Sequence, residues 1–375
     1  MTKFSGKLDS IQALRGLAAL LVALFHCAGV QKEGLDPSRI AEISLLSGFW
    51  DRGYAGVDLF FVISGFIMVY VTHDKPYNRK DIGRFLYKRV TRIYPLWWVF
   101  ASFMALYFLI SYGQAAPPDR VSGMNSLSYL IKSCLLIPQH HVPILGVGWT
   151  LIHEVYFYII FAGFLFFDRT KLPFLLGGWA ALILLGTLMS FNAGMSHDYP
   201  SLVSSLLTLE FIAGAFAALL ITRGIFRFEK TCLILGVISV ILAMIFYTGT
   251  SSDLTSWGRV VVYTVPFTLM TYGAVVCEKK GYLNYPKFLV SLGNWSYSLY
   301  LSHFLVFLTI RRVLEYVAPF LPEQLQSQAP GWIDNFVFSI IALAATIIFS
   351  ALCYRFIERP LLKLSRRAFE IKLKA

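Results

Sequence analysis

Long apolar runs separated by short polar segments make up most of this chain. A helix needs about 20 apolar residues to cross the hydrocarbon core of a bilayer. Stretches of this kind cover residues 9–30, 53–72, 93–112, 147–167, 172–190, 200–222, 231–249, 257–277, 288–310 and 333–355. The pattern therefore predicts an all-α, polytopic membrane protein with about ten transmembrane helices. We expect residues 1–375 to form one membrane-embedded domain with no fused soluble domain.

The composition supports a membrane protein. Hydrophobic residues make up 57% of the 375 positions and charged residues only 14%, whereas soluble domains carry about 25% charged residues. The five cysteines include no C-x-x-C pair, so neither a disulfide framework nor a zinc site is predicted. We expect no metal in this protein.

The net charge of +12 allows two explanations, which are nucleic-acid binding and the enrichment of Lys and Arg in cytoplasmic loops. If the N-terminus lies inside, 24 of the 33 basic residues fall in inner segments and 8 in outer ones, with Arg15 inside a span. This bias is the one that the positive-inside rule requires. We therefore expect both termini to be cytoplasmic and expect no nucleic-acid partner.

Two ionisable residues lie on one face of the first span. Arg15 and His26 are eleven residues apart, which on an α-helix returns the side chain to nearly the same direction, ~16 Å further along the axis. Ionisable residues are costly inside a membrane and usually mark functional sites. With the orientation above, Arg15 lies in the inner third of its span and His26 in the outer third.

Three further titratable residues are expected near the outer surface, each on a different span. They are Asp58, Glu154 and His303. A histidine beside carboxylates is the arrangement that general-base activation of a hydroxyl requires. We expect His26 to remove a proton from a hydroxyl, with Asp58 or Glu154 orienting its ring.

Arg89 and Arg92 lie at the inner end of the third span, below Arg15. Guanidinium groups bind phosphate through paired, charge-assisted hydrogen bonds. A donor with phosphates at one end and a reactive group on a long arm would connect these arginines to the outer histidine. Acyl-coenzyme A has this shape.

Each of these residues also has a structural explanation. Arg89 and Arg92 are also explained as topology-setting charges beside the anionic leaflet, and Arg15 as a side chain that extends to the inner surface. His303 is also explained as a packed histidine between helices, and Asp58 as a helix cap. The common depth of the titratable residues favours the functional interpretation over four separate explanations.

The chain resembles the acyltransferase-3 family of membrane proteins in six motifs that occur in the family's order and extend over nearly the whole chain. The motifs are Arg15-x10-His26, Gly56 to Phe66, Arg89 to Pro95, Gly148 to Tyr158 with Trp149 and Glu154, Ser296 to His303 with Tyr300, and Phe356 to Pro360. The resemblance implies helices around a pore-like cavity, acyl-coenzyme A entering from the cytoplasm, and acyl transfer to a glycan outside. It also implies that Arg15 and His26 form the catalytic pair.

The resemblance further implies that Arg89 and Arg92 hold the coenzyme phosphates, and it makes His303, Trp149 and Tyr300 candidates for the substrate side. The amino-acid sequences of the motifs are most similar to those of bacterial exopolysaccharide O-acetyltransferases. It predicts an enzyme of the bacterial inner membrane that moves acetyl from acetyl-coenzyme A to a hydroxyl of an extracellular polysaccharide or its lipid-linked repeat unit. Polysaccharide assembly proteins are candidate partners.

Two functions from other classes stay open. One is a transporter or flippase of a sugar or lipid-linked glycan precursor, because intramembrane charges also mark transport paths. The other is a non-catalytic scaffold of a polysaccharide assembly complex. Within the enzyme hypothesis, the residues do not distinguish acetyl from succinyl, or direct transfer from an acetyl-histidine intermediate.

Overall fold

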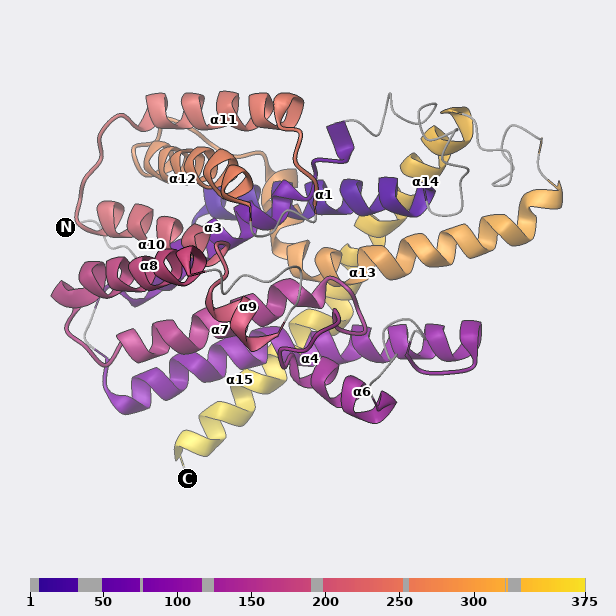
Figure 1. The fold of residues 1–375 in the computed structure, drawn as a ribbon, viewed down its shortest axis with the longest axis horizontal. Helices are drawn as coiled ribbons and strands as arrows, with labels where there is room; N and C mark the ends of the chain where they lie inside the picture. The colour runs from indigo at the N-terminus through magenta and orange to yellow at the C-terminus, as the bar shows by residue number, and fades with distance from the viewer. Residues whose placement is uncertain are drawn as a thin grey trace.

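A computed structural model describes residues 7–32, 49–74, 77–116, 125–189, 198–251, 256–320, 322 and 332–374. Within these ranges the chain is helical and contains no β-strand. Most of the long helices run along a common direction, antiparallel to their neighbours in the chain (Figure 1). The prediction of an all-α fold is confirmed.

The helices have the following bounds, in chain order. They are α1 (Asp9–Lys32), α3 (Ala55–Thr72), α4 (Arg79–Tyr112), α6 (Ser126–Leu135), α7 (Gly148–Phe164), α8 (Leu172–Leu188), α9 (Tyr199–Val203), α10 (Thr208–Thr222), α11 (Glu229–Phe246), α12 (Trp257–Lys279), α13 (Lys287–Val317), α14 (Trp332–Cys353) and α15 (Arg359–Lys374). A π-helical turn, Tyr354–Glu358, joins the last two.

Within the described residues, eight helical segments are long and apolar enough to cross a membrane. The two other predicted spans correspond to α7 and α13. Each predicted span therefore coincides with helical structure, and the polytopic membrane fold is confirmed.

Two boundaries differ from the sequence-based expectation. The third span was expected to begin at residue 93, but α4 begins at Arg79 and runs for 34 residues. Asn78 and Asp81 start it with a capping box, in which each side chain accepts a hydrogen bond from the other residue's backbone N–H, and this pairing stabilises a helix start. The expected span at 200–222 is divided into α9 and α10.

Helix α1 lies inside the bundle and packs against α3, α12, α13 and α14. Its contact with α13 depends on two glycines. A Cβ atom on Gly293 would lie 1.8 Å from the carbonyl oxygen of Gln12, and one on Gly16 would lie 2.9 Å from the backbone nitrogen of Gly293. Small residues at a helix crossing let two backbones approach closely, so this pair of glycines sets the distance between α1 and α13.

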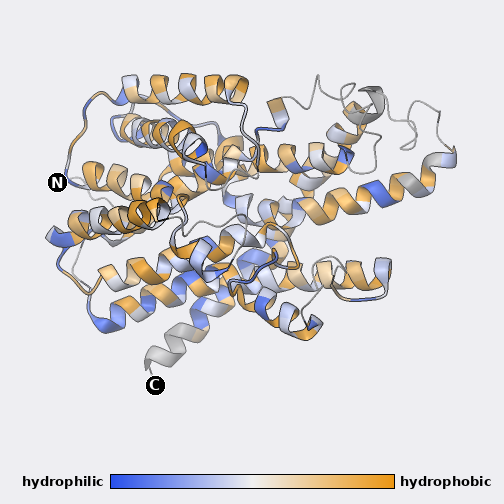
Figure 2. Ribbon diagram, viewed as in Figure 1, coloured by the Kyte–Doolittle hydropathy of each residue, from blue (hydrophilic) through white to orange (hydrophobic). Residues whose placement is uncertain are grey.

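Large apolar side chains also point outward from the bundle. Ile110, Phe174 and Leu188 are each more than three-quarters exposed, and most of the helices are apolar along much of their length (Figure 2). A soluble protein rarely presents apolar surface on this scale. These faces are the ones that contact lipid.

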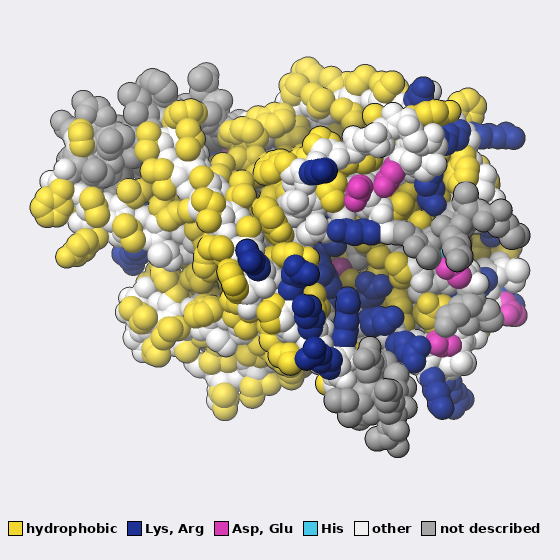
Figure 3. All heavy atoms as spheres, turned by 180° about the vertical axis from the view of Figure 1, so that it is seen from behind, with side chains coloured by type: hydrophobic (Ala, Val, Ile, Leu, Met, Phe, Trp, Pro, Cys, Tyr) yellow, Lys and Arg dark blue, Asp and Glu magenta, His cyan; other side chains and the backbone are white. Residues whose placement is uncertain are grey.

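Lys and Arg side chains gather in one region of the surface (Figure 3). The N-terminal parts of α4 and of α15, two helices that pack against one another, carry the exposed side chains of Arg79, Lys80, Lys88, Arg359 and Lys363. The basic charge is therefore concentrated near one end of the bundle rather than spread over it.

Candidate active site

A cavity of about 110 Å³ lies among α1, α3, α4, α7 and α13. Helix α3 contributes mainly apolar residues to its wall, and the other helices contribute most of the polar ones. The polar side chains are Arg15, Ser64, Arg89, Arg92, Thr150, Glu154, Tyr158, Ser296, Tyr297 and Tyr300. The cavity thus brings together predicted site residues from four different helices.

Three arginines line the cavity. Arg89 lies over the rings of Phe85 and Tyr158, with its guanidinium carbon 5.3 Å and 5.5 Å from the ring centres. Its Nε atom is buried and makes no hydrogen bond within the described chain. Arg15 enters from α1 and interacts electrostatically with Arg92 and Glu154. Among the described residues, the Nε donor of Arg89 is therefore left without a partner at a site rich in positive charge.

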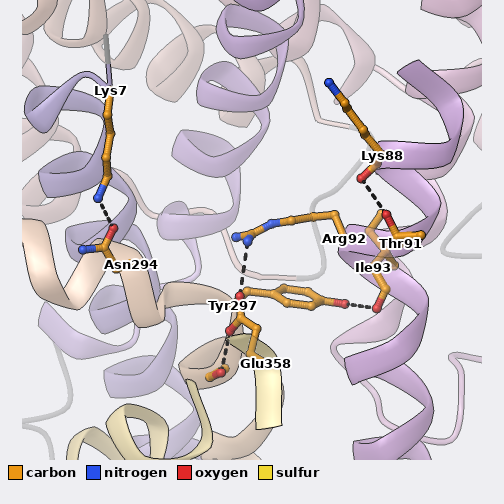
Figure 4. A network of polar contacts seen from close by, with 9 residues as sticks. Lys7, Lys88, Thr91, Arg92, Ile93, Asn294, Tyr297 and Glu358 are labelled. Carbon is orange, nitrogen blue, oxygen red and sulfur yellow. Dashed lines mark hydrogen bonds and ion pairs between the residues drawn. The ribbon is translucent and has the colours of Figure 1, made fainter. Parts of the chain in front are cut away.

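Arg92 is held by a buried carboxylate from the far end of the chain. Its Nη1 donates to Glu358 Oε1 at 3.2 Å, and Ser298 donates to the other oxygen, Oε2, at 2.6 Å. The Arg92 guanidinium carbon lies 5.6 Å from the ring centre of Tyr297, whose hydroxyl donates to the carbonyl oxygen of Ile93 at 2.7 Å. Figure 4 shows these groups meeting between α4 and α13.

Glu358 is a site residue that the sequence analysis did not select. It ends the π-helical turn between α14 and α15 and is only 2% exposed. Pro360 follows two residues later and has no N–H for the preceding turn, which favours an irregular helix at this point. The motif from Phe356 to Pro360 was the available signal, but its role depends on a contact with Arg92, which lies on a distant part of the chain.

Glu154 lies beside the arginines rather than beside His26. Ser64 donates to Glu154 Oε1 at 3.0 Å, and the hydroxyl of Tyr158 donates to the same oxygen. Its carboxylate also interacts electrostatically with Arg15. The expectation that Glu154 orients His26 therefore does not fit the structure, because both its position and its partners belong to the arginine end of the cavity.

His26 and His303 contact one another across the α1–α13 interface. The Nε2 atom of His303 lies 3.1 Å from Nδ1 of His26, and the two ring centres are 4.9 Å apart. His303 is fully buried, whereas His26 is half-buried. The two residues were expected at a common depth, and their direct contact was not predicted. The burial of His303 at the α1–α13 interface also fits the alternative explanation of a packed histidine between helices.

Tyr300 connects the cavity to the histidine pair. It lines the cavity, and its ring centre lies 6.0 Å from that of His303. Its hydroxyl donates to the carbonyl oxygen of Val147 at 3.0 Å and lies 2.7 Å from Oγ1 of Thr150. Trp149 packs against Phe61 beside this region, outside the group that lines the cavity.

Asp58 occupies a separate buried position. Its two carboxylate oxygens accept hydrogen bonds from Nε and Nη2 of Arg259 at 3.0 Å and 2.9 Å, and both side chains are almost fully buried. Glu210 interacts electrostatically with this pair. Asp58 neither caps α3 nor contacts the ring of His26, because Arg259 on α12 binds both of its oxygens. Sequence reasoning placed Arg259 in an outer segment and missed this pairing.

The arrangement separates two kinds of chemistry. Among the described residues, the carboxylates that interact with Arg15 or Arg92 are those of Glu154 and Glu358. Three arginines and two carboxylates leave this end of the cavity favourable to an anionic ligand. The histidine pair is not part of the cavity wall, and it adjoins the cavity through Tyr300, whose ring centre lies 6.0 Å from that of His303. In the described part of the chain no group of three or more His, Cys, Asp or Glu side chains is placed to bind a metal ion, and the described cysteines are unpaired.

Comparison with known proteins identifies similar chains. A family model described as an acyltransferase domain matches residues 8–355. The exopolysaccharide production protein ExoZ of Rhizobium meliloti is 30% identical over 261 residues, which cover 67% of this chain and 75% of that protein. The acyltransferase MdmB of Streptomyces mycarofaciens is 24% identical over 382 residues, covering 96% of this chain and 93% of its own.

A third relative is longer than this chain. The peptidoglycan O-acetyltransferase OatA of Listeria monocytogenes is 25% identical over 398 aligned residues, which cover 96% of this chain but 57% of that protein. No solved structure matches the chain.

Proposed function

The chain belongs to the acyltransferase-3 family and is an acyltransferase, and from this premise we propose that it transfers an acetyl group from acetyl-coenzyme A to a sugar hydroxyl. The acceptor in this proposal is an extracellular polysaccharide or its lipid-linked repeat unit. The enzyme lies in the bacterial inner membrane with both termini in the cytoplasm, so that the donor enters at the end that carries Arg89 and Arg92.

The observation that supports a coenzyme A donor is the convergence of three arginines on one cavity. Coenzyme A carries several phosphate charges, and arginine binds phosphate with two parallel hydrogen bonds. Arg89 is stacked on two rings while its Nε has no protein partner, which is the state expected of a side chain that waits for an anionic ligand. Arg15 lies on the path from these phosphates to the histidines and steadies the thioester end of the donor.

His26 supplies the base in this proposal. The reaction needs a group that removes the proton of the sugar hydroxyl as its oxygen attacks the acetyl carbon. Asp58 and Glu154 are already bound to Arg259, Ser64 and Tyr158, whereas His26 is half-buried. The hydroxyl oxygen forms a bond to the acetyl carbon, the bond from that carbon to sulfur breaks, and the proton passes through His26 to the sulfur of coenzyme A.

The polysaccharide acceptor is inferred from the relatives. ExoZ is named for exopolysaccharide production and OatA for O-acetylation of peptidoglycan. Both names indicate large glycans that are assembled at or beyond the cell membrane. A glycan hydroxyl is therefore the acceptor class that we assign to the side of the cavity that adjoins the histidine pair.

Proton NMR of the polysaccharide secreted by the host tests this function. We expect the O-acetyl signals to disappear in a His26→Ala strain that makes equal amounts of enzyme and polymer. His141→Ala is the matched control, because His141 lies outside the cavity wall and the histidine pair. An unchanged acetyl pattern with reduced polymer export would favour the transporter or scaffold alternatives instead.

A quench experiment separates the two roles open to His26. Membranes that turn over acetyl-coenzyme A labelled in its acetyl group are denatured in acid or alkali, and the protein is examined for bound label. If His26 acts as a general base, we expect no label on the protein. Label bound to His26 would instead show an acetyl-histidine intermediate.

A further inference from the structure

The hydrogen bonds of His303 define which of its ring nitrogens carries a proton. Its Nδ1 lies 3.1 Å from the carbonyl oxygen of Leu299. A carbonyl oxygen only accepts hydrogen bonds, so Nδ1 is the donor and carries the hydrogen. The ring is fully buried, and its hydrogen bonds to the described residues include none to a carboxylate. In the neutral ring the lone pair is therefore on Nε2, which is the atom that faces His26.

The same reasoning applies to His26. Its Nδ1 lies 3.0 Å from the carbonyl oxygen of Val22 and 3.1 Å from Nε2 of His303. Both neighbours are acceptors, so Nδ1 of His26 carries a hydrogen that the two acceptors share. The lone pair of the neutral His26 ring then lies on Nε2, for which the described residues provide no hydrogen-bond partner.

The structure assigns His303 as the positioning residue of the catalytic base: it accepts a hydrogen bond from Nδ1 of His26 and thereby presents Nε2 of His26 to the acceptor hydroxyl. This assignment rests on the proposed function. In this assignment His303 orients the ring of His26, whereas Asp58 or Glu154 was expected to do so from the sequence. The partner of the base is a second imidazole instead of a carboxylate.

The contact also accommodates the charge that arises during the reaction. When the hydroxyl O–H bond breaks, a new N–H bond forms at Nε2 of His26 and the ring becomes positively charged. The hydrogen on Nδ1 stays in its bond to His303, whose lone pair stabilises that charge. The proton on Nε2 then passes to the thiolate sulfur of coenzyme A, and both rings return to their starting states.

Two substitutions at His303 test this role. In His303→Gln the side-chain oxygen takes the place of Nε2 and still accepts from His26. In His303→Asn the amide keeps a group near Leu299 but leaves nothing at the position of Nε2. The pair therefore removes the contact with His26 in one variant and retains it in the other, with similar polarity in both.

The assay measures coenzyme A release and acetyl transfer by the full chain in vesicles, with chemically de-O-acetylated host polysaccharide as acceptor. We expect kcat to fall at least tenfold in His303→Asn, with the KM for acetyl-coenzyme A within about twofold of wild type, and to recover most of its value in His303→Gln. Equal kcat in wild type and both variants would overturn the assignment, as would equal losses in both variants.

A measurement on the unsubstituted protein keeps the test independent of folding. Nitrogen-15 NMR of protein labelled at histidine distinguishes protonated from bare ring nitrogens, and His26→Ala identifies the His26 signals by their loss. We expect a protonated Nδ1 and a bare Nε2 at His26. A proton on Nε2 would overturn the inference even if acetyl transfer is normal, whereas failure of wild type to transfer acetyl would overturn the proposed function alone.

Discussion

At the scale of single residues, the two arginines of the Arg89 to Pro95 motif differ in how they are held. Arg92 donates a hydrogen bond from Nη1 to Glu358, whereas the guanidinium of Arg89 stacks on two aromatic rings. An arginine fixed by a carboxylate presents its remaining donors in one direction. We therefore expect Arg92 to orient the donor phosphates and Arg89 to adapt to them.

Arg92→Lys tests this difference. Lysine keeps the charge but lacks the planar guanidinium, whose several donors allow hydrogen bonds to Glu358 and to a phosphate at the same time. We expect the KM for acetyl-coenzyme A to rise about tenfold, which corresponds to about 1.4 kcal/mol of binding, while kcat changes less. Steady-state kinetics in vesicles measure both values. Arg366→Lys, at an exposed position on α15, is the control and leaves both constants unchanged; a lower kcat at constant KM in Arg92→Lys would contradict a binding role.

Asp58→Asn separates a structural role of Asp58 from a catalytic one. Removing one partner of a buried ion pair leaves an uncompensated charge and costs about 3–5 kcal/mol. We expect a clearly lower thermal midpoint of unfolding in detergent, with an unchanged KM in the protein that remains folded. Asp51→Asn is the matched control, because Asp51 pairs with Lys32 at a partly exposed site, and ion pairs near solvent contribute about 0–1 kcal/mol. If Asp58→Asn has normal stability but no longer transfers acetyl, the result would support a catalytic role for Asp58.

Sequence reasoning at this scale recognised the arginines and histidines but not their partners. Helical spacing shows that Arg15 and His26 share a face, because both lie on one helix. The pairs Arg92–Glu358 and Asp58–Arg259 join helices far apart in the chain, and no spacing rule connects them. Depth in the membrane was also an insufficient guide, because residues at similar depths on different helices can face different neighbours.

At the scale of helices, the α1–α13 crossing determines whether the two histidines meet. Gly293 has no room for a Cβ atom against Gln12. The closeness of the backbones at this point continues along both helices to His26 and His303. The crossing is thus part of the site although none of its glycines lines the cavity.

Gly293→Ala is expected to separate the two helices. The added methyl group must displace the backbone of α1, so we expect acetyl transfer to fall more than tenfold and the thermal midpoint to decrease. Gly177→Ala on α8, where a Cβ atom meets nothing within 4 Å, should leave both properties close to wild type. Equal behaviour of the two variants would show that the crossing tolerates extra volume.

Helix existence was predictable from apolar length alone, but helix ends were less so. The extension of α4 back to Arg79 follows from a capping box in a polar segment, which a hydropathy window does not detect. The π-helical turn at Tyr354–Glu358 likewise has no apolar signature. Both irregular features contribute residues to the arginine end of the cavity, so the least predictable parts of the helices matter most for the site.

At the scale of the whole molecule, the concentration of basic residues near one end of the bundle predicts that this end faces the cytoplasm, which is the orientation that the proposed reaction requires. Lys80, near the start of α4, is expected in the cytoplasm and Thr248, just after α11, outside. Both positions are exposed, so cysteines placed there report which side each faces.

The orientation is tested with Lys80→Cys and Thr248→Cys in a chain whose native cysteines are replaced. We expect a membrane-impermeant maleimide added to intact cells to label the cysteine at position 248 and to reach position 80 only after the membrane is opened. The opposite pattern would place the arginine end of the cavity outside and contradict the entry of the donor from the cytoplasm.

The position of the arginines, remote from the histidines, has a consequence for the proposed enzyme in its metabolic setting. The phosphates that these arginines would bind are the same before and after the acetyl group leaves. Contacts that do not distinguish substrate from product bind both with similar strength, so free coenzyme A should compete with acetyl-coenzyme A for the same cavity. The rate of polysaccharide O-acetylation would then depend on the ratio of acetyl-coenzyme A to free coenzyme A. The degree of acetylation at the cell surface would therefore change with the carbon supply of the cell.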